Sequence, residues 1–290
     1  MREDKFSLIP AGTYVLGSNN FYPEEAPQFE HSISEFWMSR TPVTNSEFLE
    51  FVNQTGYVTT AELPPAEDVN ASPGSLLFRE TPGPVNLNDW RQWWEWVPGI
   101  TWRNPQGLET PIDQFLNHPV THVSYVDAQA YCEWAQVCLP TEEEWEIAAR
   151  GGLQNESFSW GSTNQTPRNL MANTWQGSFP WRNTGALGWH RTSPVGIFPP
   201  NGYGLFDVPG NVWEWTRTPW VSSHDSAVQA QVQKCSCGCS PVSSGEMMTV
   251  KGGSHLCSIE YCFRYRPAAR SSQSVSATTS HLGFRIVKYQ

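Results

Sequence analysis

Turn-forming and aromatic residues are spread so densely along this chain that long helices and long strands are not expected. The 290 residues include 22 Gly and 23 Pro, which favour turns, and 15 Trp, 14 Phe and 9 Tyr, which carry large apolar surfaces. Only 16% of the residues are charged. This combination predicts a loop-rich fold that is held together by packed rings and is poor in regular secondary structure.

Length and charge exclude several classes of protein. A chain of 290 residues forms one large domain or two small ones and can bury a substantial core. The net charge of −10 argues against nucleic-acid binding, because phosphates require a basic face. No run of about 18 apolar residues is present, so no membrane span is expected. The charged N-terminal residues and the odd number of cysteines, seven, favour a cytoplasmic, mostly reduced protein.

Capping signals predict where the helices begin and end. Thr44 with Glu47, and Thr141 with Glu144, have the spacing of capping boxes, and Gly151 suits the C-terminal end of the second helix. Apolar periodicity predicts another helix over 125–135, two short strands within 7–18 and one strand over 30–38.

Residues 59–107 interrupt this pattern with repeated Pro and Gly, and we interpret them as an insertion. The segment is rich in tryptophan, a side chain that is costly to leave exposed. We therefore expect the insertion to be ordered and either packed on the domain or lining a groove, with core packing favoured for most of its rings. These rings are Trp90, Trp93, Trp94, Trp96 and Trp102.

His118 and His122 have the four-residue spacing that binds metal from a helix. Pro119 and the extended pattern of the surrounding residues argue against a helix there. We interpret this histidine pair as structural.

A second candidate metal site lies on the loop that contains Gly210. Asp207 and Glu214 offer hard oxygen ligands on this loop, which suits Ca²⁺. The alternative is a turn with a solvated Asp and a buried Glu that accepts backbone hydrogen bonds, and chemistry alone favours this alternative. The closely spaced Cys235, Cys237 and Cys239 suit a soft metal or are incidental, and no role is assigned to them.

Two cysteines near the C-terminus, Cys257 and Cys262, stand five positions apart. The preceding Gly252 and Gly253 allow a sharp turn or a close backbone approach, and aromatic residues and arginines alternate after the second cysteine. The pair is equally consistent with a disulfide that staples a loop and with a metal-binding or redox dithiol.

The order of these motifs resembles the formylglycine-generating enzyme (sulfatase-modifying factor) family over nearly the whole chain. Many of the shared blocks also occur in relatives that have the fold without the activity. The discriminating feature is the cysteine pair followed by Phe-Arg-Tyr-Arg. The other blocks include residues 9–12, 41–45, 139–142, 173–177, 199–205, 210–215 and 282–285.

The resemblance implies one α+β domain over residues 1–290, with a C-type-lectin-like architecture low in regular secondary structure. It implies copper- and O2-dependent oxidation of a cysteine to Cα-formylglycine. The cysteine would lie in a Cys-x-Pro-x-Arg motif of an unfolded sulfatase or a related peptide. We expect a monomer with no nucleic-acid or membrane partner.

The same resemblance implies roles for individual residues. Cys257 and Cys262 would bind Cu(I), because thiolates and Cu(I) are both soft, and would leave room for a third thiolate from the substrate. Ser254 would lie near an O2 pocket, Tyr261 beside the metal, and Trp213 would shield the site from water. Substrate contacts are expected from Glu62, Trp93, Trp94 and Arg266.

Calcium is also implied by the resemblance. Asp207 and Glu214 would supply side-chain ligands, and Gly210 and Val212 backbone carbonyls. A second calcium site would begin at Asn173 and Thr174, but Leu187 stands where the family has an acidic ligand, which leaves that site without its carboxylate.

Three alternatives remain open at this stage. The first is a copper oxidase of the same fold that acts on another peptide thiol. The second is a non-catalytic, lectin-like binding module in which the cysteines are a staple. The third is a non-haem iron oxidase, which would need a histidine triad that the sequence does not supply.

Overall fold

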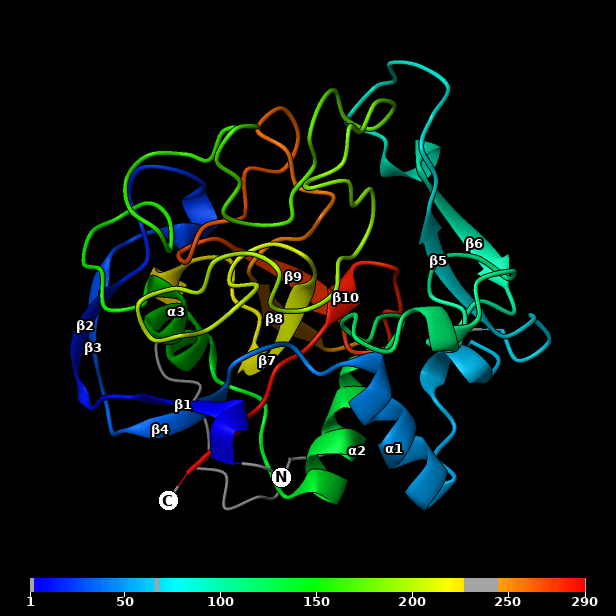
Figure 1. The fold of residues 1–290 in the computed structure, drawn as a ribbon, viewed down its shortest axis with the longest axis horizontal. Coiled ribbons are helices and arrows are strands. Elements are labelled where there is room, and N and C mark those ends of the chain that lie inside the picture. The colour runs from blue at the N-terminus through cyan, green and yellow to red at the C-terminus, as the bar shows by residue number, and fades with distance from the viewer. Residues whose placement is uncertain (1–2, 66–67, 227–244, 290) are drawn as a thin grey trace.

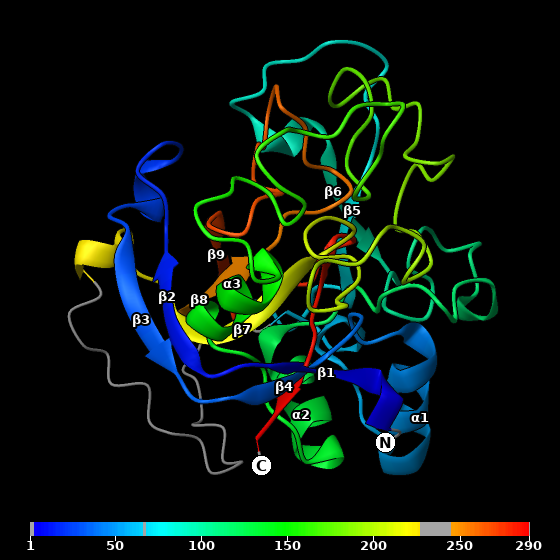
Figure 2. The same cartoon turned by 60° about the vertical axis from the view of Figure 1, so that its left-hand side comes forward.

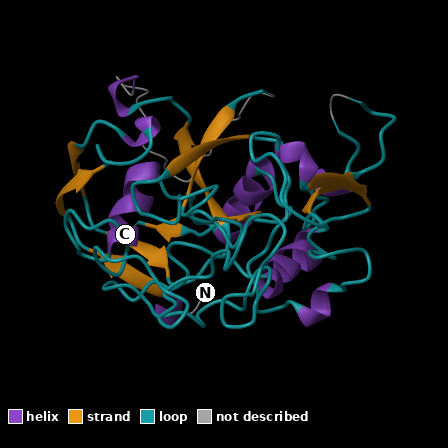
Figure 3. Cartoon of the chain, turned by 90° about the horizontal axis from the view of Figure 1, so that it is seen from above, coloured by secondary structure: helices purple, strands orange, loops and turns teal. Residues whose placement is uncertain are grey.

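Short elements joined by long loops make up the fold, as the teal segments of Figure 3 show. The computed structural model describes residues 3–65, 68–226 and 245–289. The three cysteines at 235, 237 and 239 lie outside the described residues. Irregular backbone of this extent follows from the density of Gly and Pro along the chain.

The described residues form three α-helices and several short strands. The helices are α1 (Asn45–Thr55), α2 (Tyr125–Ala135) and α3 (Glu142–Arg150). None of the described helices is long and apolar enough to cross a membrane. This composition confirms an α+β fold low in regular structure. The strands are β1 (Phe6–Ile9), β2 (Gly12–Leu16), β3 (Phe29–Ile33), β4 (Phe36–Ser39), β5 (Gly74–Phe78), β6 (Trp94–Pro98), β7 (Trp213–Pro219), β8 (Met247–Lys251), β9 (Arg270–Ser274), β10 (Leu282–Gly283) and β11 (Val287–Lys288).

Two sheets organise the chain. The larger has the order β10-β7-β8-β9, in which β10 pairs with β7 in parallel and the remaining pairs are antiparallel. The smaller has the order β1-β4-β11, so the first and last strands of the chain flank one central strand. The two termini accordingly lie at the same side of the molecule (Figures 1 and 2). The hairpins β2-β3 and β5-β6 stand apart from these sheets.

The helix boundaries follow the capping signals. Thr44 and Thr141 each accept a hydrogen bond from the backbone three residues on and complete capping boxes with Glu47 and Glu144. Gly151 ends α3 in the left-handed conformation, which Gly adopts at little cost. The capping predictions are confirmed.

The single strand expected over 30–38 is wrong. The chain forms two strands there, β3 and β4, separated by Ser34 and Glu35. Strand β3 pairs with β2, whereas β4 pairs with β1 and β11. Alternating apolar residues indicate extended backbone, but they do not show where one strand ends and the next strand, with different partners, begins.

The described part of the tryptophan-rich segment contributes the β5-β6 hairpin at the right of Figure 1. Trp102 is fully buried in the main core, where its ring meets Phe48 edge to face at 5.2 Å between centroids. Trp93 is 1% exposed, whereas Trp90 and Trp96 are 52% and 42% exposed. Core packing therefore accounts for some of these rings and leaves others open to solvent.

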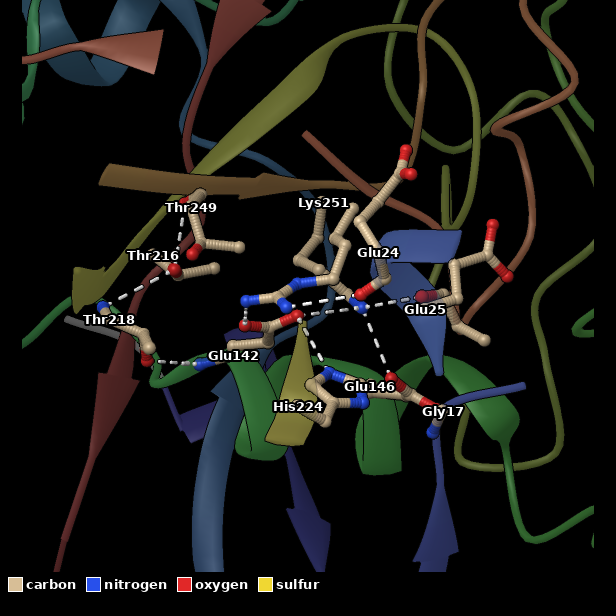
Figure 4. A network of polar contacts seen from close by, with 12 residues as sticks. Gly17, Glu24, Glu25, Glu142, Glu146, Thr216, Thr218, His224, Thr249 and Lys251 are labelled. Atoms are coloured by element: carbon tan, nitrogen blue, oxygen red, sulfur yellow. Dashed lines mark hydrogen bonds and ion pairs between the residues drawn. The ribbon is translucent and has the colours of Figure 1, made fainter. Parts of the chain in front are cut away.

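A buried ionic network joins α3 to the larger sheet (Figure 4). Lys251 at the end of β8 is fully buried, and its Nζ lies 3.1 Å from Glu146 and 3.5 Å from Glu142. Arg270 at the start of β9 meets the other oxygen of Glu142 at 2.7 Å. Burial by itself would raise the pKa of Glu142, but Lys251, His224 and Arg270 lower it to about 2.

This network predicts a loss of stability in acid. The pKa of Glu142 in the folded protein lies below its ordinary value of 4.5. Ionised Glu142 therefore stabilises the folded state fully above pH 4.5, and this stabilisation is lost as pH falls toward 2. The difference between the ordinary and the folded pKa of Glu142 corresponds to about 3 kcal/mol in the free energy of unfolding. The free energy of unfolding, measured with urea, should therefore fall steeply between pH 6 and pH 2.5 in the wild-type protein. It should fall less steeply in Glu142→Gln. Glu143→Gln, one residue along the helix, is the control; equal slopes in both variants would contradict this origin.

Candidate functional site

A cleft of about 440 Å³ opens between the β5-β6 hairpin, the larger sheet and the loop that follows β8. The insertion contributes one wall, the start of β7 and the strand β9 contribute another, and residues 254–264 contribute the third. The lining is mostly aromatic near the two cysteines. The lining residues are Leu76, Trp90, Trp93, Trp94, Phe179, Trp213, Ser254, Leu256, Cys257, Tyr261, Cys262, Arg264, Ser271, Gln273, Ala277, Thr279 and His281.

Two glycines allow the loop to enter the cleft. Gly252 has φ +94° and Gly253 has φ +67°, a region that side chains other than Gly rarely adopt. A Cβ on Gly252 would lie 2.8 Å from the Trp145 ring, and one on Gly253 would lie 3.0 Å from the Arg264 backbone. The expected turn and close approach are both present.

Tight turns bring the two cysteines together. The Cys257 N–H donates to the Ser254 carbonyl at 2.9 Å, and the Cys262 N–H donates to the Ser258 carbonyl at 2.8 Å. The two sulfur atoms lie 2.8 Å apart as thiols. Cys257 is 1% exposed, whereas Cys262 is only partly buried. The Ser254 N–H donates to the Cys257 sulfur at 3.4 Å, which fixes this serine beside the pair.

The two thiols differ in acidity. Burial, together with the hydrogen bond to Cys262, raises the pKa of Cys257 well above its ordinary value. The hydrogen bond from Cys257 and the positive charge of Arg264 lower the pKa of Cys262. Cys262, the more exposed of the two cysteines, is therefore the one that ionises first, with Cys257 as its donor.

Tyr261, directly before Cys262 in the sequence, packs against the rings of Phe179 and Trp93. Tyr261 stacks on Phe179 at 4.5 Å with an interplanar angle of 1°, and it meets Trp93 edge to face at 5.2 Å. Burial raises the pKa of Tyr261 to about 12, so it lines the cleft as a neutral phenol. Trp213, 6% exposed at the start of β7, also lines the cleft.

The polar side of the cleft had no assignment from sequence patterns. Ser271 and Gln273 lie two residues apart on β9, so strand alternation directs both to one face. His281 packs against Trp94 at 4.8 Å, and its Nδ1 lies 2.8 Å from the Thr279 hydroxyl. Burial and the neighbouring histidines lower the pKa of His281 to about 3, so it is neutral. Alternation along β9 was a usable signal, whereas no local pattern marks His281.

Two residues expected to bind substrate do not line the cleft. Glu62 accepts hydrogen bonds from Thr59 and pairs with Arg103 at 3.0 Å, so it caps its own turn. Arg266 is 1% exposed, and its guanidinium forms a two-pronged ion pair with Glu25 at 2.5 and 2.8 Å. A buried, paired guanidinium is unavailable to a peptide, and its role is structural.

The two carboxylates of the loop at 207–214, Asp207 and Glu214, have different partners. Asp207 is buried; one carboxylate oxygen accepts from the Gly196 N–H at 2.7 Å, and the other has no hydrogen-bond partner among the described residues. Burial raises the pKa of Asp207 to about 6. Both oxygens of Glu214 are engaged by Arg285, and one also accepts from the Trp145 indole at 2.6 Å. Asp207 thus fits a cation ligand better than Glu214 does.

Asn173 and Thr174, at the second expected calcium position, form hydrogen bonds with neutral groups. The Thr174 hydroxyl accepts from Gln165 at 2.6 Å, and the Asn173 amide donates to the Arg191 carbonyl at 2.9 Å. Leu187 is 60% exposed and offers only backbone atoms.

The histidine pair is structural, as expected. His122 is fully buried, with its ring nitrogens 2.7 Å from the Ser75 hydroxyl and 2.9 Å from the Pro105 carbonyl. His118 contacts the Thr192 hydroxyl at 3.1 Å. Within the described ranges, no three His, Cys, Asp or Glu side chains converge as metal ligands, so no iron-type histidine triad is assembled there.

Comparison with known proteins defines the family. The model of the sulfatase-modifying factor enzyme 1-like domain matches residues 1–290. The formylglycine-generating enzyme of Mycobacterium tuberculosis is 51% identical over 96% of each chain. The enzyme of that name from Mus musculus is 43% identical over 97% of this chain and 74% of its own. PvdO from Pseudomonas aeruginosa, 21% identical, shares the fold with a TM-score of 0.66 over 98% of this chain and 94% of its own. The chain belongs to the sulfatase-modifying factor enzyme 1-like family.

The unequal thiols predict selective alkylation. At pH 7.5, iodoacetamide should modify Cys262 at least about tenfold faster than Cys257, because Cys262 is more accessible and more ionised. Mass spectrometry of the peptides after timed quenching measures both rates. Cys132, buried in α2, reports whether the protein stays folded. Equal rates at the two cysteines would contradict the assignment.

Proposed function

We propose that this protein oxidises a cysteine of a peptide substrate, an unfolded sulfatase, to Cα-formylglycine. The observation that carries the proposal is the pair of thiols, Cys257 and Cys262, in contact on the wall of an open aromatic cleft. A disulfide that only closed the loop would not need such a cleft. The relatives that carry the name formylglycine-generating enzyme support the same activity for this chain.

The residues present fit Cu(I). Two adjacent sulfur ligands suit a soft, low-coordinate metal, and the cleft leaves space for a third sulfur from the peptide. Bound copper would supply the redox chemistry that couples O2 to oxidation of the substrate cysteine. Cys257 and Cys262 would hold it, and Ser254 would fix the position of Cys257 through its N–H.

The other lining residues have separable tasks. Trp213, Trp93 and the neutral Tyr261 keep water from the reacting side chain. Ser271, Gln273 and Thr279 offer hydrogen bonds to an extended peptide backbone. The exposed ring of Trp90 offers an apolar surface on which the side chains of the peptide can pack.

The overall reaction balances with an external reductant. The substrate side chain loses its C–S bond and one C–H bond and becomes an aldehyde, with release of hydrogen sulfide. That change removes two electrons, whereas reduction of O2 to the aldehyde oxygen and one water takes four. Two thiol molecules supply the other two electrons as they form a disulfide.

The proposal predicts aldehyde formation by the copper-loaded protein. With O2, a thiol reductant and a Cys-x-Pro-x-Arg peptide, mass spectrometry should detect the aldehyde, and hydrogen sulfide should form in equal amount. Cys257→Ser and Cys262→Ser should each lower the rate by at least about a hundredfold, because one soft ligand is lost. Absence of aldehyde from the copper-bound wild-type protein would refute the proposal. Loss of Cu(I) binding in Cys262→Ser would itself argue against a simple staple.

One observation favours a second candidate, the same chemistry on another peptide thiol. None of the described residues that line the cleft is Asp or Glu, so the cleft wall offers no carboxylate for a substrate arginine. A matched peptide with Ala in place of Arg, run in the same assay, separates the two. Similar turnover of both peptides would favour the broader substrate class.

We also propose Ca²⁺ at the 207–214 loop, with the free Asp207 oxygen as the side-chain ligand and the carbonyls of Gly210 and Val212 beside it. The support is the buried, unpartnered oxygen of Asp207. Glu214 would remain the partner of Arg285.

Calcium should therefore stabilise the protein through Asp207. Millimolar Ca²⁺ should raise the Tm of the wild-type protein by several degrees, because a ligand that binds only the folded state stabilises it. Asp207→Ala should lose this response. Asp113→Ala, at an exposed position, is the control. A calcium response that survives in Asp207→Ala would rule out this site.

A further inference from the structure

One charged side chain stands out in the cleft wall. Of the described residues that line the cleft, only Arg264 carries a formal charge, and it lies two positions beyond Cys262. Its Nε is buried and has no hydrogen-bond partner among the described residues. Arg264 lines the same cleft as the two cysteines, and its buried, unpartnered nitrogen calls for a functional explanation.

A short N-terminal segment holds this arginine in place. Glu24 in the 3₁₀ turn η2 (Pro23–Glu25) accepts from Arg264 Nη2 at 2.6 Å, and the Tyr22 ring lies 3.9 Å from the guanidinium carbon. The Phe263 N–H donates to the Tyr22 hydroxyl at 3.1 Å. Contacts from residues about 240 positions away in sequence therefore fix the segment that follows Cys262.

Charge counting shows why a cation is needed there. Two thiolates around Cu(I) carry a net charge of −1, and a third thiolate from a peptide raises this to −2. Concentrated negative charge in a cleft lined by aromatic rings is poorly solvated and requires a fixed positive partner. No other residue among those described in the cleft lining provides one: a tyrosine such as Tyr261 is never positively charged, and His281 is neutral.

We infer that Arg264 is the counter-cation of the Cys257–Cys262 copper site, and that Tyr22 and Glu24 hold its guanidinium toward the sulfurs. The inference rests on the proposed function, because it takes the two thiols as copper ligands. Arg264 is thus a positioning residue that balances charge for the metal and for the incoming substrate thiolate. Glu24 neutralises it in the free protein, which lets a guanidinium remain in an aromatic cleft.

The test is anaerobic Cu(I) affinity, measured by competition with a chromophoric chelator and needing no turnover. Arg264→Met should weaken Cu(I) binding at least about tenfold. Arg264→Lys keeps the positive charge without the planar guanidinium and should retain most of the wild-type Cu(I) affinity. Arg79→Met removes an exposed arginine that pairs with Glu95 outside the cleft and should leave affinity unchanged. The double variant Glu24→Gln/Arg264→Met leaves no unpaired carboxylate and should bind Cu(I) as weakly as the single variant.

A peptide arm separates charge balance from a structural role. A Cys-x-Pro-x-Arg peptide and its Ser counterpart are titrated onto the copper-loaded proteins. Arg264→Met should weaken binding of the Cys peptide by at least about tenfold more than that of the Ser peptide, because only Cys brings a further negative charge.

Each outcome is decisive. If wild-type protein binds no Cu(I), the proposed function and this inference both fall. If wild-type protein binds Cu(I) and Arg264→Met binds it equally well, the inference fails while the copper site stands. If affinity returns in the double variant, the defect came from the unpaired Glu24, and Arg264 is only structural.

Discussion

The buried carboxylate of Glu142 determines where the cysteine loop can lie. Lys251 precedes this loop and Arg270 follows it, and both side chains end on Glu142, at 3.5 and 2.7 Å. A loop of 18 residues, 252–269, is therefore tied at both ends to one point on α3. Charges this deeply buried tolerate little displacement, because separation would leave an uncompensated ion in the core. These ion pairs reinforce the antiparallel pairing of β8 with β9, in which Lys251 stands opposite Arg270.

The middle of the loop is held by contacts of a different kind. Tyr22, Glu24 and Glu25 in and beside η2 contact residues 263–266, and the ring cluster around Phe179 supports Tyr261. Between these supports the two sulfurs meet without a covalent bond. The arrangement gives a rigid frame with two adjacent soft ligands on the cleft wall, which a metal-binding reaction site requires. The same frame explains why an arginine can line an apolar cleft.

Local signals in the sequence were reliable where the structure depends on neighbours in the chain. The capping boxes at Thr44 and Thr141 and the glycine turn at 252–253 all formed as expected. Predictions failed where a residue's partner is remote. The 30–38 strand divides because its halves pair with different strands, and Arg266 is removed from the site by Glu25, 241 positions away. His281 lines the cleft directly before β10, a strand that pairs with the remote β7.

The sequence by itself determined the loop-rich, aromatic-packed character of the protein and the chemistry available to it, because composition and residue type fix turn propensity and ligand softness. It also placed two thiols within one short turn-rich segment. Only the tertiary structure decided which groups meet them. The ion pairs of Arg264 and Arg266 use adjacent carboxylates, Glu24 and Glu25, yet one arginine lines the cleft and the other is buried. That choice depends on packing between segments distant in sequence, which no local pattern encodes.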